Sequence, residues 1–400
     1  MSFVKFNDDN QIINFVRDHS DLFSCHSELA VEEISDGNLN YVYRVSDASG
    51  NSLIVKQAPP YIRIIGDDWP LTQDRIRIEQ QSLQLTAQHC PQVVPEVYHY
   101  DSEHCVILMQ DIGDHDNLRQ LLIDRTELPL LAQQLGNYLA QMMFRSSSMA
   151  MESTAHKALV KTSQNPELCK ISEEVYFWDP FCDHERNDVN PLLKDEAQSV
   201  WNNSELKCEV AKLKRRFMSD TEAMIHGDLH SGSVFATTDS CKIIDPEFSF
   251  CGPIGFDIGV LFANFLLNYA GQQNLPGDRC ERMTYQGWLL QTLSDIWQQF
   301  STHFASLMQT ETLDPSLSEP GYQQWYLQQI WQDSLGYAGV EMTRRTIGIA
   351  HVADIMNIED PELRADSERL SLQIANMLIL QRNTLSTPKQ LDDAINQLRT

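Results

Sequence analysis

The sequence predicts an α+β protein with two lobes, a small strand-rich N-terminal lobe and a larger, mainly helical C-terminal lobe. Its 400 residues are enough for two hydrophobic cores, since single domains usually have about 100 to 200 residues. Up to about residue 110, short apolar segments alternate with turns, and beyond it long segments have helical periodicity. A hairpin pattern at residues 226–248 is the one conspicuous exception in the second half.

A β-hairpin is predicted in the first lobe. Two alternating apolar segments are separated by the turn-forming residues 47–51. Lys56 ends the second strand, on the same face as Ile54 and opposite to Leu53 and Val55, because side chains alternate along a strand. On the pattern alone, Lys56 is a solvated residue at the end of an apolar strand.

Further elements follow from the spacing of apolar residues. A helix is predicted from Thr72 to about Cys90, and a strand from Cys105 to Asp111. In the second lobe, helices are predicted at residues 129–145, 256–269, 285–303 and 322–357.

The charge of the chain limits its partners. It has 30 Lys and Arg against 56 Asp and Glu, a formal net charge of -26 and a pI near 4.7. Nucleic-acid backbones and anionic membranes would both be repelled by such a chain. We therefore expect neither as a partner.

Segments that direct or anchor a protein are not apparent. The longest apolar run, residues 258–270, contains Asn264 and Asn268 and is shorter than the roughly 20 residues of a membrane span, so it predicts a buried helix. The first ten residues lack the apolar core of a signal peptide. Nine cysteines without a C-x-x-C pair suit a reducing compartment, so we expect a cytoplasmic protein.

The stretch "HGDLHSGSVFATTDSCKIIDPEF" concentrates chemistry-bearing residues. "SVFAT" and "CKIID" are joined by "TDS" and predict a hairpin, which brings Asp228 and Asp245 to the same end. Converging carboxylates such as these and Glu247 raise one another's pKa unless a cation neutralises them, which predicts a metal. Hard oxygen ligands favour Mg²⁺.

The two histidines of this stretch leave an alternative. If His226, Asp228 and His230 were ligands together, Zn²⁺ would be favoured. We expect instead that both imidazoles hold the loop by hydrogen bonds.

Taken together, these motifs resemble a known family. "HGDLHSGS", followed 17 residues from its Asp by "DPE", resembles the catalytic and metal-binding loops of the protein-kinase-like fold. The H-G-D form is typical of small-molecule kinases such as aminoglycoside and choline kinases. Ser233 in place of the usual Asn, D-P-E in place of D-F-G, and the segments "DGNLNYVYRV" and "GDDWPLTQDRIRIE" are similar to 5-methylthioribose kinases. The resemblance extends from about Leu29 to His351.

The resemblance implies roles for the hairpin residues. Asp228 would be catalytic, orienting the acceptor hydroxyl and accepting its proton. Asp245 would hold Mg²⁺ on the β- and γ-phosphates of ATP, and Glu247, across Pro246, would be the second metal ligand, because Ser233 is a poor one. Asp257, in "CGPIGFDIG", resembles the aspartate that braces the catalytic loop.

The resemblance also implies a nucleotide site in the first lobe. "DGNLN" (residues 36–40) would fold over the phosphates, with Asn40 as its best candidate contact, although a single glycine could equally mark an ordinary turn. Lys56 would contact the α- and β-phosphates and pair with Glu79. No G-x-x-x-x-G-K-[ST] sequence is present, so a P-loop fold is not supported.

A hinge is expected between the lobes, where backbone groups of Gln110, Asp111 and Ile112 would meet adenine. The chain then divides into a nucleotide-binding lobe (1–109), the hinge (110–112) and a catalytic and substrate-binding lobe (113–400).

Substrate recognition is expected from two further segments. Trp69, predicted among turn residues of "GDDWP", would cover a small sugar as a lid, or it is a packing residue. Arg344 and Arg345 resemble the arginines that bind ribose hydroxyls and stabilise the transferring phosphoryl group. Because adjacent helical residues point about 100° apart, at most one of the two is expected to be solvated while the other faces the site. On the pattern alone, surface solvation is favoured.

The resulting hypothesis is an ATP- and Mg²⁺-dependent kinase that phosphorylates the anomeric hydroxyl of 5-methylthioribose in methionine salvage. The alternatives are a same-fold kinase for choline, homoserine or an aminoglycoside, and a non-catalytic pseudokinase. The resemblance implies a homodimer. Residues 152–220 predict a family-specific helical insert whose role the sequence does not reveal.

Overall fold

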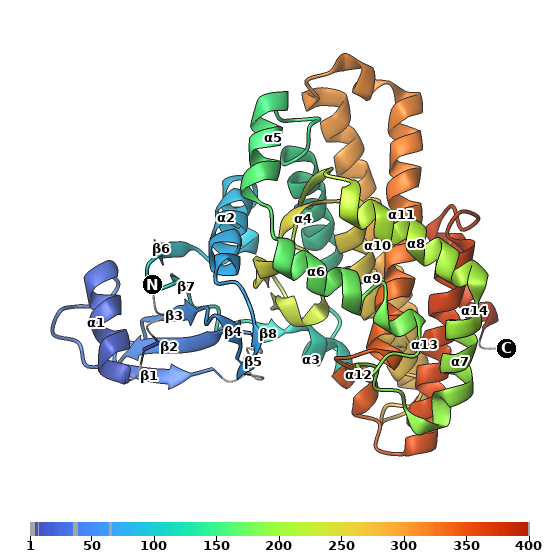
Figure 1. Cartoon of the computed structure of the whole chain (residues 1–400), viewed down its shortest axis with the longest axis horizontal. Helices are drawn as coiled ribbons and strands as arrows, with labels where there is room; N and C mark the ends of the chain where they lie inside the picture. Colours follow the sequence, from blue (N-terminus) through green and yellow to red (C-terminus); the bar gives the residue numbers. More distant parts are fainter. Residues whose placement is uncertain (1–4, 7, 35–38, 64–65, 399–400) are drawn as a thin grey trace.

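The computed structural model describes residues 5–6, 8–34, 39–63 and 66–398. It contains the two predicted parts, an N-terminal part built on an antiparallel sheet and a larger helical part (Figure 1). The α+β class is therefore confirmed. Most of the loop predicted to cover phosphates, residues 36–40, lies outside the described residues.

The N-terminal part consists mainly of strands with two helices. Its elements are α1 (Asp9–His19), β1 (Leu29–Glu33), β2 (Tyr41–Asp47), β3 (Ser52–Gln57), β4 (Tyr61–Ile62), β5 (Gly66–Pro70), α2 (Asp74–His89), the 3-10 turn η1 (Pro91–Val93), β6 (Val97–Asp101) and β7 (Val106–Gln110).

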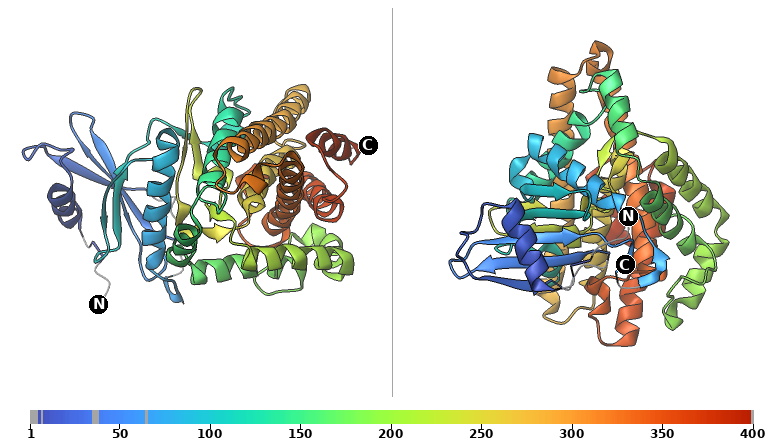
Figure 2. Two further views of the ribbon diagram at one scale, coloured as in Figure 1. Left: turned by 90° about the horizontal axis from the view of Figure 1, so that it is seen from above. Right: turned by 60° about the vertical axis from the view of Figure 1, so that its left-hand side comes forward.

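Five strands form the main sheet in the order β1-β2-β3-β7-β6, all antiparallel. Leu53 and Val55 point to the face that α1 covers, whereas Ile54 belongs to the core shared with α2. The predicted alternation of β3 is thereby confirmed. Viewed from above, α1, the sheet, α2 and the helical part follow one another (Figure 2). Lys56 shares the face of Ile54 and therefore points toward α2.

The C-terminal part is mainly helical, with short strands. Its elements are β8 (Asp116–Asn117), α3 (Leu118–Ile123), α4 (Leu131–Arg145), α5 (Ser153–Thr162), α6 (Pro166–Val175), η2 (Asp179–Phe181), η3 (Pro191–Leu193), α7 (Lys194–Asn202), α8 (Ser204–Ser219), β9 (Ala223–Ile225), η4 (Ser231–Ser233), β10 (Val234–Ala236), β11 (Cys241–Ile243), η5 (Pro246–Phe248), β12 (Phe250–Gly252), α9 (Ile254–Gly271), α10 (Arg279–Glu311), η6 (Pro315–Ser318), α11 (Pro320–Ile347), α12 (Ala353–Met356), α13 (Pro361–Gln381) and α14 (Pro388–Gln397).

The predicted hairpin in the second half is present. β10 pairs with β11 in antiparallel register, with Val234 opposite Ile243, and β8 extends the sheet on the other side of β10. β9 and β12 pair separately, just before and just after this unit. Short strands thus hold both ends of the segment that carries Asp228 and Asp245.

Helix α9 is the centre of the helical part. All 18 of its residues are buried, as predicted for a core helix, although it is longer than the apolar run suggests and would by length and composition suffice to cross a membrane. Its backbone packs closely against that of α11. A Cβ on Gly259 would lie 2.6 Å from the Ser334 carbonyl oxygen, so only glycine permits this approach.

Two predictions about the elements were wrong. The helix predicted at residues 322–357 ends at Ile347, because Gly348 is extended and Ala350 has a φ of 63°, and α12 follows separately. The residues of "GDDWP", predicted as turn residues, form β5, which pairs with β4.

Candidate active site

The loop that follows β9 carries Asp228 and is held by backbone hydrogen bonds. Gly227 has a φ of +83°, and a Cβ there would lie 2.2 Å from the carbonyl oxygen of Phe248, so a larger residue cannot occupy it. The carboxylate of Asp257 accepts the backbone N–H groups of His226 (2.6 Å) and Gly227 (3.0 Å). The bracing contact expected of Asp257 is therefore present.

His226 joins this loop to the strand that leads to Asp245. Its Nε2–H donates to the carbonyl oxygen of Ile244 (2.8 Å), and its Nδ1 accepts the N–H of Asp228 (3.3 Å). Both ring nitrogens are thus engaged within the protein, as expected for a loop-holding histidine, and neither is available to zinc. The hydroxyl of Ser233 donates to the Asp228 carbonyl oxygen (3.2 Å), so this side chain also serves the loop.

Asp228 is surrounded by groups that favour its ionised form. Its Oδ1 accepts the hydroxyl of Tyr176 at 2.8 Å and lies 3.9 Å from Arg344 Nη2, while Oδ2 lies 3.6 Å from His230 Nε2. Burial alone would raise the pKa of Asp228, but these polar and cationic neighbours, with Arg345, hold it well below its usual range. The carboxylate can therefore accept a hydrogen bond or a proton from a bound hydroxyl.

His230 is held as a neutral imidazole. Its Nδ1 accepts the backbone N–H of Gly232 (2.9 Å) and lies 3.4 Å from Arg119 Nη2, which places the ring proton on Nε2, facing Asp228. Burial and the neighbouring arginines lower the pKa of His230 to about 3. Its hydrogen bonds are those expected of a loop-holding residue.

The two arginines of α11 are both buried, whereas the sequence pattern alone favoured solvated side chains. Neither is solvated: Arg344 is 6% exposed and Arg345 is 7% exposed. Both donate to the fully buried carboxylate of Glu341, at 2.6 Å and 2.7 Å, because residues three and four positions apart share a helix face. The guanidinium of Arg344 also lies over the ring of Tyr176, 3.9 Å from its centroid.

Lys56 lies between two carboxylates on the N-terminal side of the site. Its ammonium donates to Glu79 at 2.7 Å and also to Asp245. The predicted pairing of Lys56 with Glu79 is therefore present. Burial disfavours a charged lysine, but the nearby carboxylates of Asp245, Glu79 and Glu247 outweigh it and raise the pKa of Lys56.

Asp245 stands at a sharp turn between β11 and η5. Its φ is +61°, in the left-handed region that few residues other than glycine and asparagine or aspartate adopt. Its side chain is 48% exposed although Lys56 is buried. The ammonium of Lys56 outweighs the effect of burial and lowers the pKa of Asp245, so an ionised, accessible carboxylate results.

Glu247 is instead turned inward. Its Oε2 accepts Asn40 Nδ2 (2.8 Å) and lies 3.4 Å from Arg75 Nε. Arg75 is fully buried and also donates to Asn40 Oδ1 (3.1 Å), so it ties the strand-rich part to the D-P-E turn. The side chain of Asn40 is thus engaged within the protein, and a nucleotide contact by it stays a prediction.

In the segment expected to be the hinge, some backbone groups already make hydrogen bonds within the protein. The N–H of Gln110 donates to Glu96, and the carbonyl of Ile112 accepts the N–H of His115 (2.9 Å). The Asp111 side chain accepts Arg44 Nε at 2.7 Å and so anchors the segment to β2. Within the described residues, the N–H of Ile112 and the carbonyl of Asp111 make no such bond.

Trp69 packs against a small apolar cluster. It lies on β5 and is half-buried against Ile62, Leu71 and Leu168, the last of which belongs to α6. The packing alternative left open by the sequence is present, and a role as a lid stays a prediction.

Residues 152–220, whose role the sequence did not reveal, contribute to both loops of the site. Tyr176, next to the end of α6, donates to Asp228, and Asn165 donates to the backbone carbonyls of Glu247 (2.8 Å) and Ser249 (3.2 Å). No local pattern marks either residue. Glu341, by contrast, stands three and four residues before the two arginines, and this spacing could have identified it.

A family model described as the phosphotransferase enzyme family matches residues 30–282. Together with the fold and the arrangement of the two loops, this match defines a phosphotransferase.

Curated relatives narrow the class. A methylthioribose kinase of Yersinia pseudotuberculosis is 44% identical over 92% of this chain and 90% of that protein. Those of Yersinia enterocolitica and Pectobacterium carotovorum are 44% and 42% identical, over 93% of this chain and 92% and 93% of theirs. A solved choline kinase from Cryptosporidium parvum covers 98% of this chain and 97% of its own at 12% identity, with a TM-score of 0.47. The chain belongs to the phosphotransferase enzyme family and, within it, to the methylthioribose kinases.

Proposed function

We propose that this protein transfers the γ-phosphoryl group of ATP to the anomeric hydroxyl of 5-methylthioribose, giving 5-methylthioribose 1-phosphate in methionine salvage. The names of its relatives support this substrate. The observation that carries the proposal is the ionised Asp228 carboxylate, oriented by Tyr176 beside the buried Arg344.

On the acceptor side, Asp228 is the proposed catalytic residue. Since Tyr176 occupies Oδ1, the acceptor hydroxyl would donate to Oδ2 and give up its proton there as the phosphoryl bond forms. Arg344 and Arg345 would bind the sugar hydroxyls and stabilise the charge on the transferring group. Trp69 would cover the sugar.

On the donor side, Lys56 would contact the α- and β-phosphates when nucleotide displaces its bond to Asp245. The donor set suits Mg²⁺, because Asp245 offers an exposed carboxylate and Glu247 keeps Oε1, which has no hydrogen bond among the described residues. Asp245 and Glu247 would hold the ion across Pro246, and when bound it would neutralise charge on the β- and γ-phosphates.

The remaining assignments follow from the same proposal. Residues 1–109 would bind nucleotide, with Asn40 near the phosphates, and residues 113–400 would bind the sugar. Between them, the free N–H of Ile112 and carbonyl of Asp111, next to Gln110, would meet adenine. We further propose a cytoplasmic homodimer that binds neither nucleic acid nor membranes.

Two other functions are less well supported. Buried arginines beside Asp228 disfavour a cationic acceptor such as choline or an aminoglycoside. A pseudokinase would lack one of the reacting groups, whereas Asp228, Asp245 and Lys56 are all present.

The test is release of ADP from purified protein with Mg-ATP and 5-methylthioribose, compared with choline, homoserine and an aminoglycoside. Selective turnover of methylthioribose is expected. Turnover of another alcohol alone would contradict the proposed substrate but support the proposed reaction. No turnover with any acceptor would favour the pseudokinase.

A further inference from the structure

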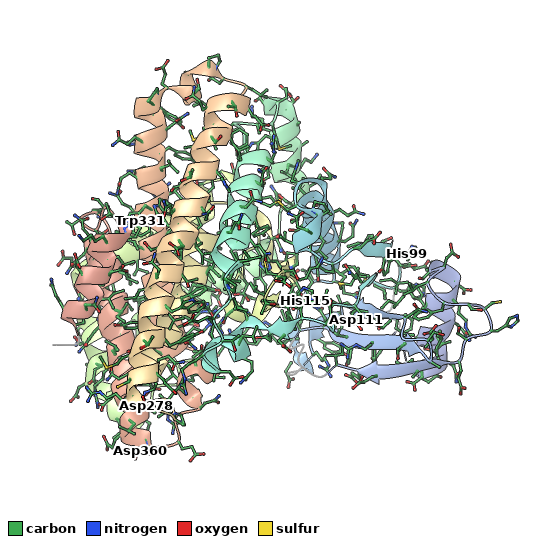
Figure 3. The ribbon with its side chains drawn as sticks, turned by 180° about the vertical axis from the view of Figure 1, so that it is seen from behind. His99, Asp111, His115, Asp278, Trp331 and Asp360 are labelled. Carbon is green, nitrogen blue, oxygen red and sulfur yellow. The ribbon has the colours of Figure 1, made fainter. Side chains whose placement is uncertain are left out.

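Two histidines and an aspartate gather on the N-terminal part, away from the candidate active site. A ring nitrogen of His19, a ring nitrogen of His99 and a carboxylate oxygen of Asp101 all lie within 4.8 Å of one another. His19 ends α1, and the other two residues share one face of the edge strand β6. His99 lies on the N-terminal part near α1, farther from the helical part than Asp111 and His115 (Figure 3).

The hydrogen bonds of these residues leave ligand atoms free. Nδ1 of His19 lies 2.9 Å from the carbonyl oxygen of Phe15, so it carries the proton and Nε2 keeps its lone pair. Metal-binding histidines typically donate their second ring nitrogen to a backbone carbonyl in this way. Asp101 Oδ1 accepts the backbone N–H groups of Glu103 (2.8 Å) and His104 (2.7 Å) and lies 3.2 Å from His104 Nδ1, so Oδ2 is the free oxygen among the described residues.

His99 provides an independent observation. Its Nε2 is buried and has no hydrogen-bond partner within the part of the chain that the structure describes. A buried nitrogen without a partner destabilises a fold by about 1 to 3 kcal/mol, and a metal bond would satisfy it.

We propose that His19, His99 and Asp101 form a metal site, with Zn²⁺ as the ion that two imidazoles, one carboxylate and a water suit best. Three protein ligands with an open position are a common zinc arrangement. Tetrahedral ligands lie about 3.4 Å apart. The His19 and His99 rings stack on each other with centroids 4.3 Å apart and an interplanar angle of 31°, so at least one ring would have to turn out of this stack for both lone pairs to point at one ion. The ion would fasten the end of α1 to β6 and stabilise the N-terminal part, independently of phosphoryl transfer.

Zinc binding by the purified, chelator-stripped protein tests the proposal. Equilibrium dialysis against Zn²⁺ should give one tight site per chain, at least tenfold weaker in a variant carrying both His19→Ala and His99→Ala. His26→Ala is the matched control, because His26 is exposed and lies on the same N-terminal segment, and it should bind as the unaltered chain does. Equal binding by all three proteins would overturn the proposal.

Nine cysteines could also bind zinc, so the ligand type needs its own measurement. Co²⁺ bound at this site should give visible d–d bands without the near-ultraviolet band of cobalt thiolates. Zn²⁺ should also raise the melting temperature of the unaltered chain and of His26→Ala by about 3 °C or more. His99→Gln, which keeps most of the packing, should lose this rise; a rise that persists in it, or a thiolate spectrum, would contradict the site.

Discussion

The candidate active site contains two clusters of charged side chains, which differ in their numbers of acidic and basic groups. Around Lys56, three carboxylates (Glu79, Asp245, Glu247) face two cations, Lys56 and Arg75. Around Asp228, the two carboxylates of Asp228 and Glu341 face Arg344 and Arg345, with His230 neutral. The first cluster has one carboxyl group more than it has cations, although burial raises the pKa of Glu79, so a divalent ion would compensate the negative charge left when all three are ionised. The second cluster is balanced until an anionic phosphoryl group is transferred there.

The largest effect is expected for Asp228→Asn. Turnover should fall by about 1000-fold, because an amide accepts no proton from the hydroxyl, while nucleotide binding, which we assign to the Lys56 cluster, should be unchanged. Single-turnover kinetics and calorimetric titration with ATP measure the two separately. Substantial residual turnover would remove Asp228 from the catalytic role.

Lys56→Met tests the other cluster. It leaves Glu79 and Asp245 without their shared ammonium, so ATP binding should weaken and turnover should fall by about 100-fold. Loss of one partner of a buried ion pair should also reduce the free energy of unfolding by about 3 kcal/mol. Urea unfolding and ATP titration measure both, with the exposed Lys212→Met as control. Unchanged nucleotide affinity would contradict the donor assignment.

Arg344→Ala should chiefly damage use of the sugar, raising its KM and lowering kcat together by about 30-fold while the KM for ATP stays within about twofold. The control is Arg382→Ala, which removes a buried arginine that pairs with Asp333 and Glu209 and not with Asp228. Thermal melting of both variants separates binding from folding. Equal kinetic losses in the two would show that Arg344 acts through stability alone.

The smallest effect is expected for Tyr176→Phe, about tenfold in kcat, because the hydroxyl loses its bond to Asp228 and the one it accepts from Arg344 Nη2 (3.0 Å), while the ring under Arg344 is kept. The bond from Tyr176 helps to hold the pKa of Asp228 low, so its removal raises the pKa. Since the proposed base must be ionised, the acid limb of the kcat/KM profile should move to higher pH. Tyr337→Phe, which removes an equally buried hydroxyl bound to Leu213, should leave the profile in place; a shift shared by both variants would contradict a specific role.

The comparison also shows what the sequence could predict. The β10–β11 hairpin was predictable because two β segments flank a short turn. The pairing of Lys56 with Glu79 was predicted through the family resemblance alone, since the local pattern favoured a solvated Lys56 at a strand end. Tyr176 and Asn165 were not predictable, because their partners are distant in the chain and no periodicity marks them. The burial of both Arg344 and Arg345 was missed because it depends on the second half of α11, residues 333–347, being covered on all sides by distant parts of the chain.

Helix α9 implies that the active-site loop becomes stable only late in folding. Its first turn carries Asp257, which holds the loop of Asp228, yet a helix that is apolar on every side has no stable place in water until other helices cover it. Helix α11, which packs closely against it, begins about 50 residues after α9 ends and so is synthesised later. A chain that ends before α11 would therefore contain every residue of the hairpin and still have no kinase activity. During refolding, turnover would appear only when α11 packs against α9.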